Sequence, residues 1–417
     1  MRSLALCLLL LIFISKVSFS FLAIPSQISM LVFQHGFHPY LNIIFNFALG
    51  LPIFFFIIGS ISCIKKLRPS YRSLLFLLLT GLFLETLFQG IFTEGSGRGF
   101  FSWAALASSC WLILIFGVFI PSFLNLKTML IFISNCSLAL VGMSLLMWLF
   151  YPEIVFKGGR YVGIFKHIPY MVTCSTLGVV FTLARLSEDT SSIKRSLLLL
   201  GIGLSFFALL LTGTRSALMS SLFAVVLWVL RAPSQSLGLS YFKYSSILFF
   251  VVILMLFGQQ MSSYAYDIAT GRQAFIEREA QDGVASRFLE VERGWDYFQT
   301  SPWIGRGLLA KFSGSEGLDV SSYNSFKDPH NIFISAGVVG GWPFIWWTAA
   351  FLIALLVFAI KALISENVEL HVLAIYILVQ IPILVIYHWH LSLGGMADRI
   401  YWLAFGYLAL ASEDRQN

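Results

Sequence analysis

Three polar residues of this 417-residue chain have side chains suited to chemistry on a phosphorylated substrate: Arg215, Arg287 and His330. An arginine presents a planar, permanently charged fork that matches phosphate oxygens. A neutral imidazole accepts a proton near neutral pH and can therefore act as a general base. The residue types thus predict anion binding at the two arginines and proton transfer at the histidine.

Arg215 stands in the stretch LLTGTRSALMSS, and a mostly apolar stretch of only 15 residues separates it from Arg231. On a helix the two charges lie about 24 Å apart, at about 1.5 Å per residue, whereas membrane hydrocarbon is roughly 30 Å thick. If Arg231 sits at the inner membrane–water interface, Arg215 lies within the hydrocarbon, just inside its outer edge. An arginine there is costly unless it is paired or faces water. A tilted helix with Arg215 reaching the headgroups explains the spacing equally well.

Arg287 lies near the start of a helix predicted within a polar part of the chain. The stretch GVASRFLEVERGWDYFQTSPW carries an apolar stripe with alternating steps of four and three, formed by Val284, Phe288, Val291, Trp295 and Phe298. This spacing predicts an amphipathic helix, lying on the membrane surface or on the helix bundle and ended by Pro302. Taken in isolation, Arg287 is more simply explained by an ion pair with Glu290.

His330 lies in the stretch SFKDPHNIFISAGVVGG, where an apolar run begins. We expect Asp328 to cap the following helix and Pro329 to occupy its first position. His330 then falls in the first turn, where the helix dipole disfavours the imidazolium form. The alternative is a polar residue that only marks the entrance of a helix.

Two further polar clusters are weaker candidates. The loop 157–170, KGGRYVGIFKHIPY, could bind anionic headgroups or a sugar phosphate through Arg160, Lys166 and His167. A second cluster, in which a metal pair is conceivable but no third ligand is evident, contains His388, His390, Asp398 and Arg399. The sequence has no Asp-x-Asp, His-Glu-x-x-His, Gly-x-Ser-x-Gly or phosphate-loop pattern, which disfavours a metal-dependent enzyme acting on nucleotide sugars.

The composition shows what kind of scaffold holds these residues. Hydrophobic residues make up 58% of the chain and charged residues only 11%, whereas soluble domains have about 45–50% and about 25%. A soluble enzyme and a disordered chain are therefore both excluded. The net charge of +7 does not indicate nucleic-acid binding, because Lys and Arg cluster in short loops between apolar runs. The five cysteines lie in or at the ends of apolar runs without Cys-x-x-Cys spacing, so we expect neither disulfides nor a zinc site.

Membrane-spanning helices must position the polar candidates, since about 20 mostly apolar residues cross the hydrocarbon. Twelve such runs are predicted, at 4–24, 41–64, 73–93, 101–124, 128–151, 168–186, 196–212, 214–230, 245–260, 331–360, 370–388 and 397–411. The first run resembles a signal peptide, but eleven further spans favour an uncleaved helix. We therefore predict an all-α polytopic membrane protein of about 12 transmembrane helices, with one large periplasmic loop that contains the amphipathic helix.

Basic residues predict the sidedness of these spans. With the N-terminus inside, thirteen Lys and Arg fall in cytoplasmic segments and six in short outer loops, so both termini are cytoplasmic. Residues 1–260 then hold helices 1 to 9, residues 261–329 form the periplasmic loop and residues 330–417 hold helices 10 to 12. This 69-residue loop contains ten of the twenty acidic residues and is too polar to insert. All three leading candidates fall on the outer side.

The layout resembles the O-antigen ligase and polymerase family of bacterial membrane glycosyltransferases. Four stretches carry the resemblance: GRYVGIFKHIPYMV at 159–172, LTGTRSAL at 211–218, SRFLEVERGWDYFQTSPWIGRGL at 286–308 and DPHNIFISAGVVGG at 328–341. Their order, spacing and common sidedness make the resemblance specific. It covers the middle third of the chain closely and the whole chain in hydropathy.

The resemblance implies a location in the bacterial inner membrane, a polysaccharide donor on undecaprenyl pyrophosphate, and no metal or other cofactor. It also implies a lipid A-core acceptor in the ligases, and membrane lipids but no nucleic acid as partners. The essential arginines and histidine of the family map onto Arg215, Arg287 and His330. The residues agree with this, because arginines stabilise a departing pyrophosphate and a base activates the attacking hydroxyl, which would invert the anomeric centre. Secondary substrate contacts are then expected from Arg160, Lys166, His167, Arg293 and Arg306.

Family membership leaves the acceptor open, since ligases and polymerases share the donor. We favour a ligase because one loop dominates, whereas polymerases often have two comparable outer loops. An oligosaccharyltransferase acting on proteins would usually have a longer C-terminal outer region. A transporter or flippase is the alternative from another class. Its ion-binding polar groups would lie near the middle of the membrane, whereas the mid-span positions of this chain are mostly apolar, with Glu85 as the main exception.

Overall fold

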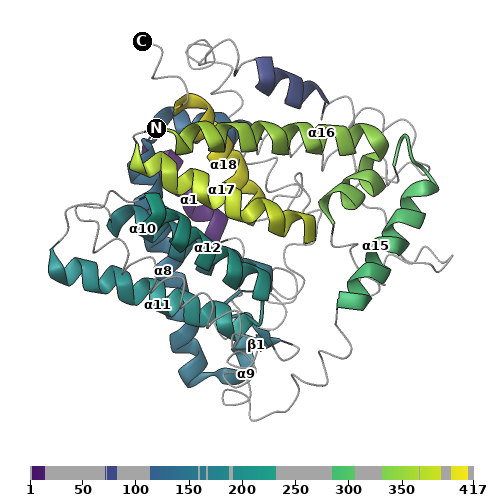
Figure 1. The fold of residues 1–417 in the computed structure, drawn as a ribbon. Coiled ribbons are helices and arrows are strands. Elements are labelled where there is room, and N and C mark those ends of the chain that lie inside the picture. Colours follow the sequence, from purple (N-terminus) through teal and green to yellow (C-terminus); the bar gives the residue numbers. More distant parts are fainter. Residues whose placement is uncertain are drawn as a thin grey trace. The chain divides into compact units, whose positions relative to one another are not determined.

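The computed structural model describes residues 2–14, 71, 73–81, 113–157, 160–165, 168–186, 191–231, 284–305, 331–365, 367–386 and 396–411, and they are mostly helical (Figure 1). Among them, four helices are long and apolar enough to cross a membrane: α8 (Leu126–Phe150), α10 (Ile168–Leu186), α11 (Ser192–Thr212) and α16 (Ile332–Leu363). These helices agree with an all-α membrane protein. The remaining predicted spans are shorter here or lie partly or wholly outside the described residues.

The other described elements are shorter. The helices are α1 (Arg2–Ile14), α7 (Ile120–Phe123), α9 (Pro152–Val155), α12 (Arg215–Arg231), α15 (Val284–Gln299), α17 (Val368–Ile386) and α18 (Met396–Ala411). One π-helical turn, η2 (Ile115–Phe119), precedes α7, and two short strands are β1 (Phe156–Lys157) and β2 (Arg160–Tyr161). Helices α8, α10, α11, α12, α16, α17 and α18 begin and end within four residues of their predicted spans, and α15 confirms the predicted amphipathic helix.

The chain divides into two compact units, which are described separately. Unit 1 comprises Met1–Phe37, Pro121–Glu279 and Phe358–Ile383. Unit 2 comprises His38–Ile120, Ala280–Val357 and Leu384–Asn417. Each unit is assembled from segments distant in the sequence, and the predicted division into membrane helices and a loop at residues 260 and 329 stays a prediction.

Helix α10 is the centre of unit 1. It packs against α8, α11 and α12, and its side chains from Cys174 to Ala184 are buried. Its hydroxyl groups bond to neighbouring helices: Ser134 on α8 lies 2.8 Å from Thr182, and Ser221 on α12 donates to Thr176 at 3.4 Å. Such bonds between hydroxyl groups hold helices together where apolar lipid gives no hydrophobic drive to associate.

A β-hairpin in unit 1 replaces part of the loop predicted at 157–170. β1 pairs antiparallel with β2, and the chain then turns at Gly163, which has a φ of 60°. The Ile164 amide donates to the Ser144 hydroxyl on α8 at 3.2 Å, and a Cβ on Gly163 would lie 2.6 Å from that oxygen. This close approach to α8 buries residues 161–165 and is not visible in the hydropathy pattern.

Aromatic side chains form the core of unit 2. Trp402 on α18 lies 4.2 Å from Phe351 on α16 between ring centroids, and both side chains are buried. Two buried hydrogen bonds join further segments to this core: Tyr71 donates to the Gly117 carbonyl at 2.6 Å, and the Trp347 indole donates to the Leu78 carbonyl at 2.8 Å. The bonds satisfy polar groups that would otherwise be costly in an apolar interior.

The end of α11 provides a test of the fold. Gly213 caps α11 with a φ of 65°, a conformation that costs a residue with a Cβ roughly 1–2 kcal/mol. Gly213→Ala should therefore lower the free energy of unfolding by about this amount. Gly203→Ala on the same helix is the matched control, because a Cβ there meets nothing within 4 Å, and it should be neutral or slightly stabilising. Thermal unfolding in detergent compares them, and equal midpoints would contradict this cap.

Candidate functional site

The turn between α11 and α12 places the backbone of Arg215 at one end of unit 1. The Thr212 hydroxyl donates to the Leu209 carbonyl at 2.7 Å and accepts the Thr214 amide at 3.3 Å. These bonds, together with the left-handed Gly213, reverse the chain so that α12 begins at Arg215. This short, hydrogen-bonded turn therefore fixes the position of the Arg215 backbone relative to the end of α11.

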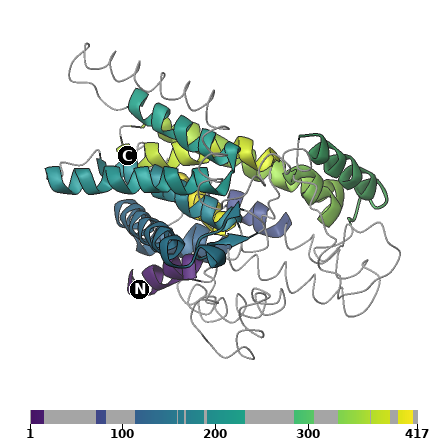
Figure 2. The same ribbon diagram turned by 90° about the horizontal axis from the view of Figure 1, so that it is seen from below.

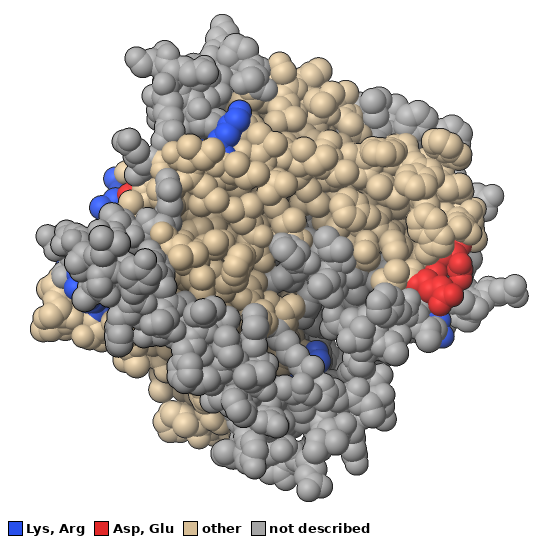
Figure 3. Space-filling view, viewed as in Figure 1, with Lys and Arg blue, Asp and Glu red and all other residues tan. Residues whose placement is uncertain are grey.

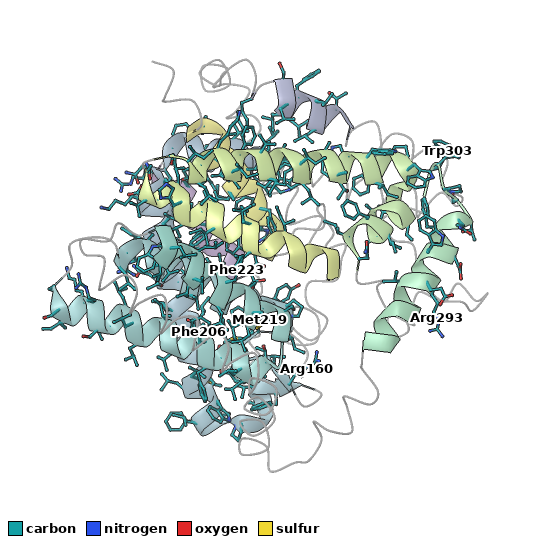
Figure 4. All side chains as sticks on the ribbon, viewed as in Figure 1. Arg160, Phe206, Met219, Phe223, Arg293 and Trp303 are labelled. Carbon is teal, nitrogen blue, oxygen red and sulfur yellow. The ribbon has the colours of Figure 1, made fainter. Side chains whose placement is uncertain are left out.

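The β-hairpin brings Arg160 to the same end of unit 1. β2 contacts α11, and Figures 1 and 2 show the hairpin beside the end of α11 that leads into α12. Arg160 is half-buried and is labelled in Figure 4. The structure thus groups two of the predicted arginines at one end of a single compact unit.

The opposite end of unit 1 carries a second group of basic residues. Arg185 lies in the last turn of α10 and donates to the Asn135 side-chain oxygen at 2.6 Å, while Lys194 and Arg195 are exposed in the first turn of α11. The 21 residues of α11 separate the two ends by about 32 Å at about 1.5 Å per residue, enough to cross a bilayer. Basic groups at both ends of an apolar helix fit a helix that crosses the hydrocarbon.

Apolar packing holds the first turns of α12 in place. The buried side chains there are Leu209, Ala217, Leu218 and Leu222, and the half-buried side chains packed against them are Val172, Phe206, Leu210 and Met219. Figure 4 labels Phe206 and Met219 of this cluster, and Phe223, which is exposed. The start of α12 is therefore fixed by its packing against α10 and α11.

Tyr161 lies beside Arg160 in β2 but does not join the candidate chemistry. Its side chain is fully buried, and its ring packs against Phe156 with 5.5 Å between centroids. Burial raises the pKa of the Tyr161 phenol well above its usual range. The phenol therefore stays protonated at any physiological pH and cannot accept a proton.

Helix α15 carries two predicted arginines of unit 2. Arg287 is the fourth residue of the helix, and Arg293 lies further along on its exposed surface (Figure 4). The neighbours of Arg293 include the exposed acidic residues Glu292 and Asp296, which form the acidic patch over α15 in Figure 3. Because carboxylates repel phosphate, these two acidic side chains weaken anion binding at Arg293.

The helix that follows His330 begins differently from the prediction. α16 starts at Ile332, and Asn331 is its cap: the Asn331 side-chain oxygen accepts the Phe333 and Ile334 amides at 3.0 and 3.2 Å. The expected cap at Asp328 is therefore wrong by three residues, because an amide oxygen closer to the first turn takes that role. His330 directly precedes the cap in the chain instead of occupying the first turn.

Several predicted residues lie outside the described part of the chain. These are Lys166, His167, Arg306, His330, His388, His390 and Glu85, and at Arg215 and Arg287 the description is limited to the backbone. Within the described residues, no three His, Cys, Asp or Glu side chains gather into a metal-binding group.

The sequence named Arg399 only within the weak cluster of His388, His390 and Asp398, whereas the structure buries it. Arg399 in the first turn of α18 is only 4% exposed, and its guanidinium lies 6.0 Å from the ring centroid of Phe116 in η2. A buried arginine within apolar helices is a functional candidate by default. The signal was present in the sequence, since this arginine opens the last apolar run, but the hydropathy pattern placed it in an outer loop.

Comparison with known proteins supports the predicted family. Residues 200–345 match the family model described as O-antigen ligase, named Wzy_C. The match extends from the middle of α11 to the early part of α16 and includes Arg215, Arg287 and His330. It confirms the predicted resemblance, and no curated protein matches the chain.

Proposed function

We propose that this protein belongs to the O-antigen ligase family and acts as an O-antigen ligase in the bacterial inner membrane. It would transfer polysaccharide from undecaprenyl pyrophosphate to a sugar hydroxyl of lipid A-core. The observation that carries the proposal is the family match at residues 200–345, since this one region contains both arginines and the histidine that the chemistry needs. The family match by itself supports a membrane-bound glycosyltransferase of the ligase or polymerase type.

In the proposed reaction the acceptor oxygen forms a bond to the anomeric carbon as the bond from that carbon to the pyrophosphate oxygen breaks. The electron pair of the broken bond goes to the pyrophosphate, and the hydroxyl proton goes to His330. Arg215 and Arg287 would stabilise the growing negative charge, which preorganised donors do most effectively where water is excluded. A single displacement inverts the anomeric centre.

The capping of α16 supports the role of His330. The first amides of a helix carry partial positive charge, and Asn331 caps these amides one residue after His330. The proposal is that His330, next in the chain to this end of α16, acts in its neutral form, the form that can accept a proton. No acidic residue occurs in the first turn of α16 to offset the partial positive charge of these amides.

The two ends of unit 1 support the sidedness of the proposal. Arg160 and Arg215 share one end, and Arg185, Lys194 and Arg195 share the other. We assign the first end to the periplasm, together with the active face, and the second to the cytoplasm with both termini. The basic patch at Arg160, with Lys166 and His167, would then contact the donor or the acceptor at the membrane surface.

A polymerase is the second candidate, because the same groups would activate the sugar hydroxyl of another lipid-linked repeat. A gel of surface glycolipid from a deletion strain separates the two functions. We expect core without O-chain, with lipid-linked polymer accumulating. Core that carries a single repeat would indicate a polymerase, and an unchanged ladder would contradict both.

His330→Ala should reduce transfer at least about 100-fold, because general base catalysis typically contributes 10²–10⁴-fold. The variant is expressed in the deletion strain, and the O-chain ladder is compared at equal protein abundance in the membrane. A normal ladder would remove the assignment of His330 as the base.

Arg215→Lys should reduce transfer on the order of tenfold, because a point charge replaces the planar fork and loses part of the stabilisation of the leaving group. Arg231→Lys, at the other end of α12, is the matched control and should leave the ladder unchanged. If Arg215→Lys behaves like this control, Arg215 only anchors the helix in the headgroups.

Chelation tests the expected independence from metal. Transfer by the purified enzyme should not change when EDTA is added, because two guanidinium groups supply the positive charge that a metal would provide. Strong inhibition would instead point to a metal site at His388 and His390.

A further inference from the structure

Helix α16 is broken near its start. Gly340 and Gly341 have non-helical backbone angles, and Gly341 has a φ of 68°. Residues 342–363 after the break are 22 residues long, or about 33 Å at about 1.5 Å per residue, which is enough to cross the hydrocarbon. The segment 332–339 is therefore not needed to span the membrane and is available for another task.

The turn that follows α15 fills the break. The Trp342 amide, freed by the break, donates to the Pro302 carbonyl at 2.8 Å. A Cβ on Gly341 would lie 2.5 Å from the carbonyl carbon and oxygen of Trp303, and a Cβ on Gly305 would collide with the Val339 carbonyl oxygen. Because backbone meets backbone at both glycines, neither position has space for a side chain.

Side chains extend this contact along α15. Phe298 is 2% exposed, and its ring lies edge-on to Trp342 with 5.3 Å between centroids. A Cβ on Gly337 would lie 2.9 Å from the Phe298 ring and 2.8 Å from the terminal methyl of Ile345, which can rotate away. The fit between Phe298 and Gly337 therefore sets how closely α15 approaches segment 332–339.

We infer that α15, the turn 301–305 and segment 332–339 form one rigid hairpin, in which Gly337, Gly341 and Phe298 are positioning residues for Arg287 and His330. Arg287 lies eleven residues before Phe298 on the same helix, and His330 lies seven residues before Gly337. A shift at the contact therefore displaces both residues relative to each other. The roles of Arg287 and His330 rest on the proposed function, whereas the hairpin itself rests on the contacts above.

The consequence is kinetic. Misplacing catalytic groups by about 1 Å can cost on the order of 100-fold in rate, even when the change lies far from the reaction. Widening the contact should thus lower kcat, while the KM for the donor changes little, because donor binding also draws on residues outside the hairpin.

The test compares glycine variants of the full-length enzyme in lipid nanodiscs. The donor is lipid-linked glycan extracted from the deletion strain, and the acceptor is core glycolipid from the same strain. Gly337→Ala should lower kcat at least about tenfold, and Phe298→Leu in the same chain should restore it to within about threefold by making room for the added methyl. Gly341→Ala should lose more activity without rescue by Phe298→Leu, and the control Gly203→Ala should lose none.

Spin labels at positions 287 and 330, in a variant without native cysteines, measure the hairpin independently of activity. We expect a narrow distance distribution, a broader one in Gly337→Ala, and a narrow one again when Phe298→Leu is added. Gly337→Ala with wild-type activity and an unchanged distribution would overturn the inference. If instead the distance pattern holds while His330→Ala remains active, the hairpin stands and the proposed catalytic role fails.

Discussion

The need to satisfy every backbone polar group in an apolar environment governs this structure. A membrane-spanning helix can break only where other groups replace its lost hydrogen bonds. At the break in α16 the Pro302 carbonyl accepts the Trp342 amide, and glycine at position 341 lets the two backbones meet. This requirement joins the turn after α15 to the start of α16, the two helices beside which Arg287 and His330 stand in the sequence.

The same physical requirement organises the polar groups of unit 1. Hydroxyl pairs connect α10 to α8 and α12, while charged side chains occur at the helix ends. Strand β2, which carries Arg160, contacts α11, and the hydrogen-bonded turn at the end of α11 leads to the backbone of Arg215. A charged end next to apolar helix surfaces favours chemistry on a lipid-linked anion at the boundary of the membrane, which agrees with the family match at residues 200–345.

Much of the helical fold could be predicted from the sequence, because hydropathy and the period of α15 depend only on local residues. The turn at 163–165 and the break at Gly340 could not, since each depends on a tertiary partner: Ser144 and the turn 301–305. The cap at Asn331 is local, but Asp328 followed by Pro329 offered a competing cap in the sequence. For the site, the sequence predicted which residues have suitable chemistry and their order along the chain. It could not predict that the strand carrying Arg160 contacts α11, or that α15 docks on segment 332–339.

The central proposal is that Arg215, Arg287 and His330 bind one lipid diphosphate. Photo-crosslinking amino acids placed singly at positions 215, 287 and 330, with position 231 as the control, test this directly in cells that make the lipid-linked glycan. The account predicts that crosslinks to the lipid-linked glycan form from the first three positions and not from position 231. Crosslinks from position 215 alone, or equally from position 231, would contradict it.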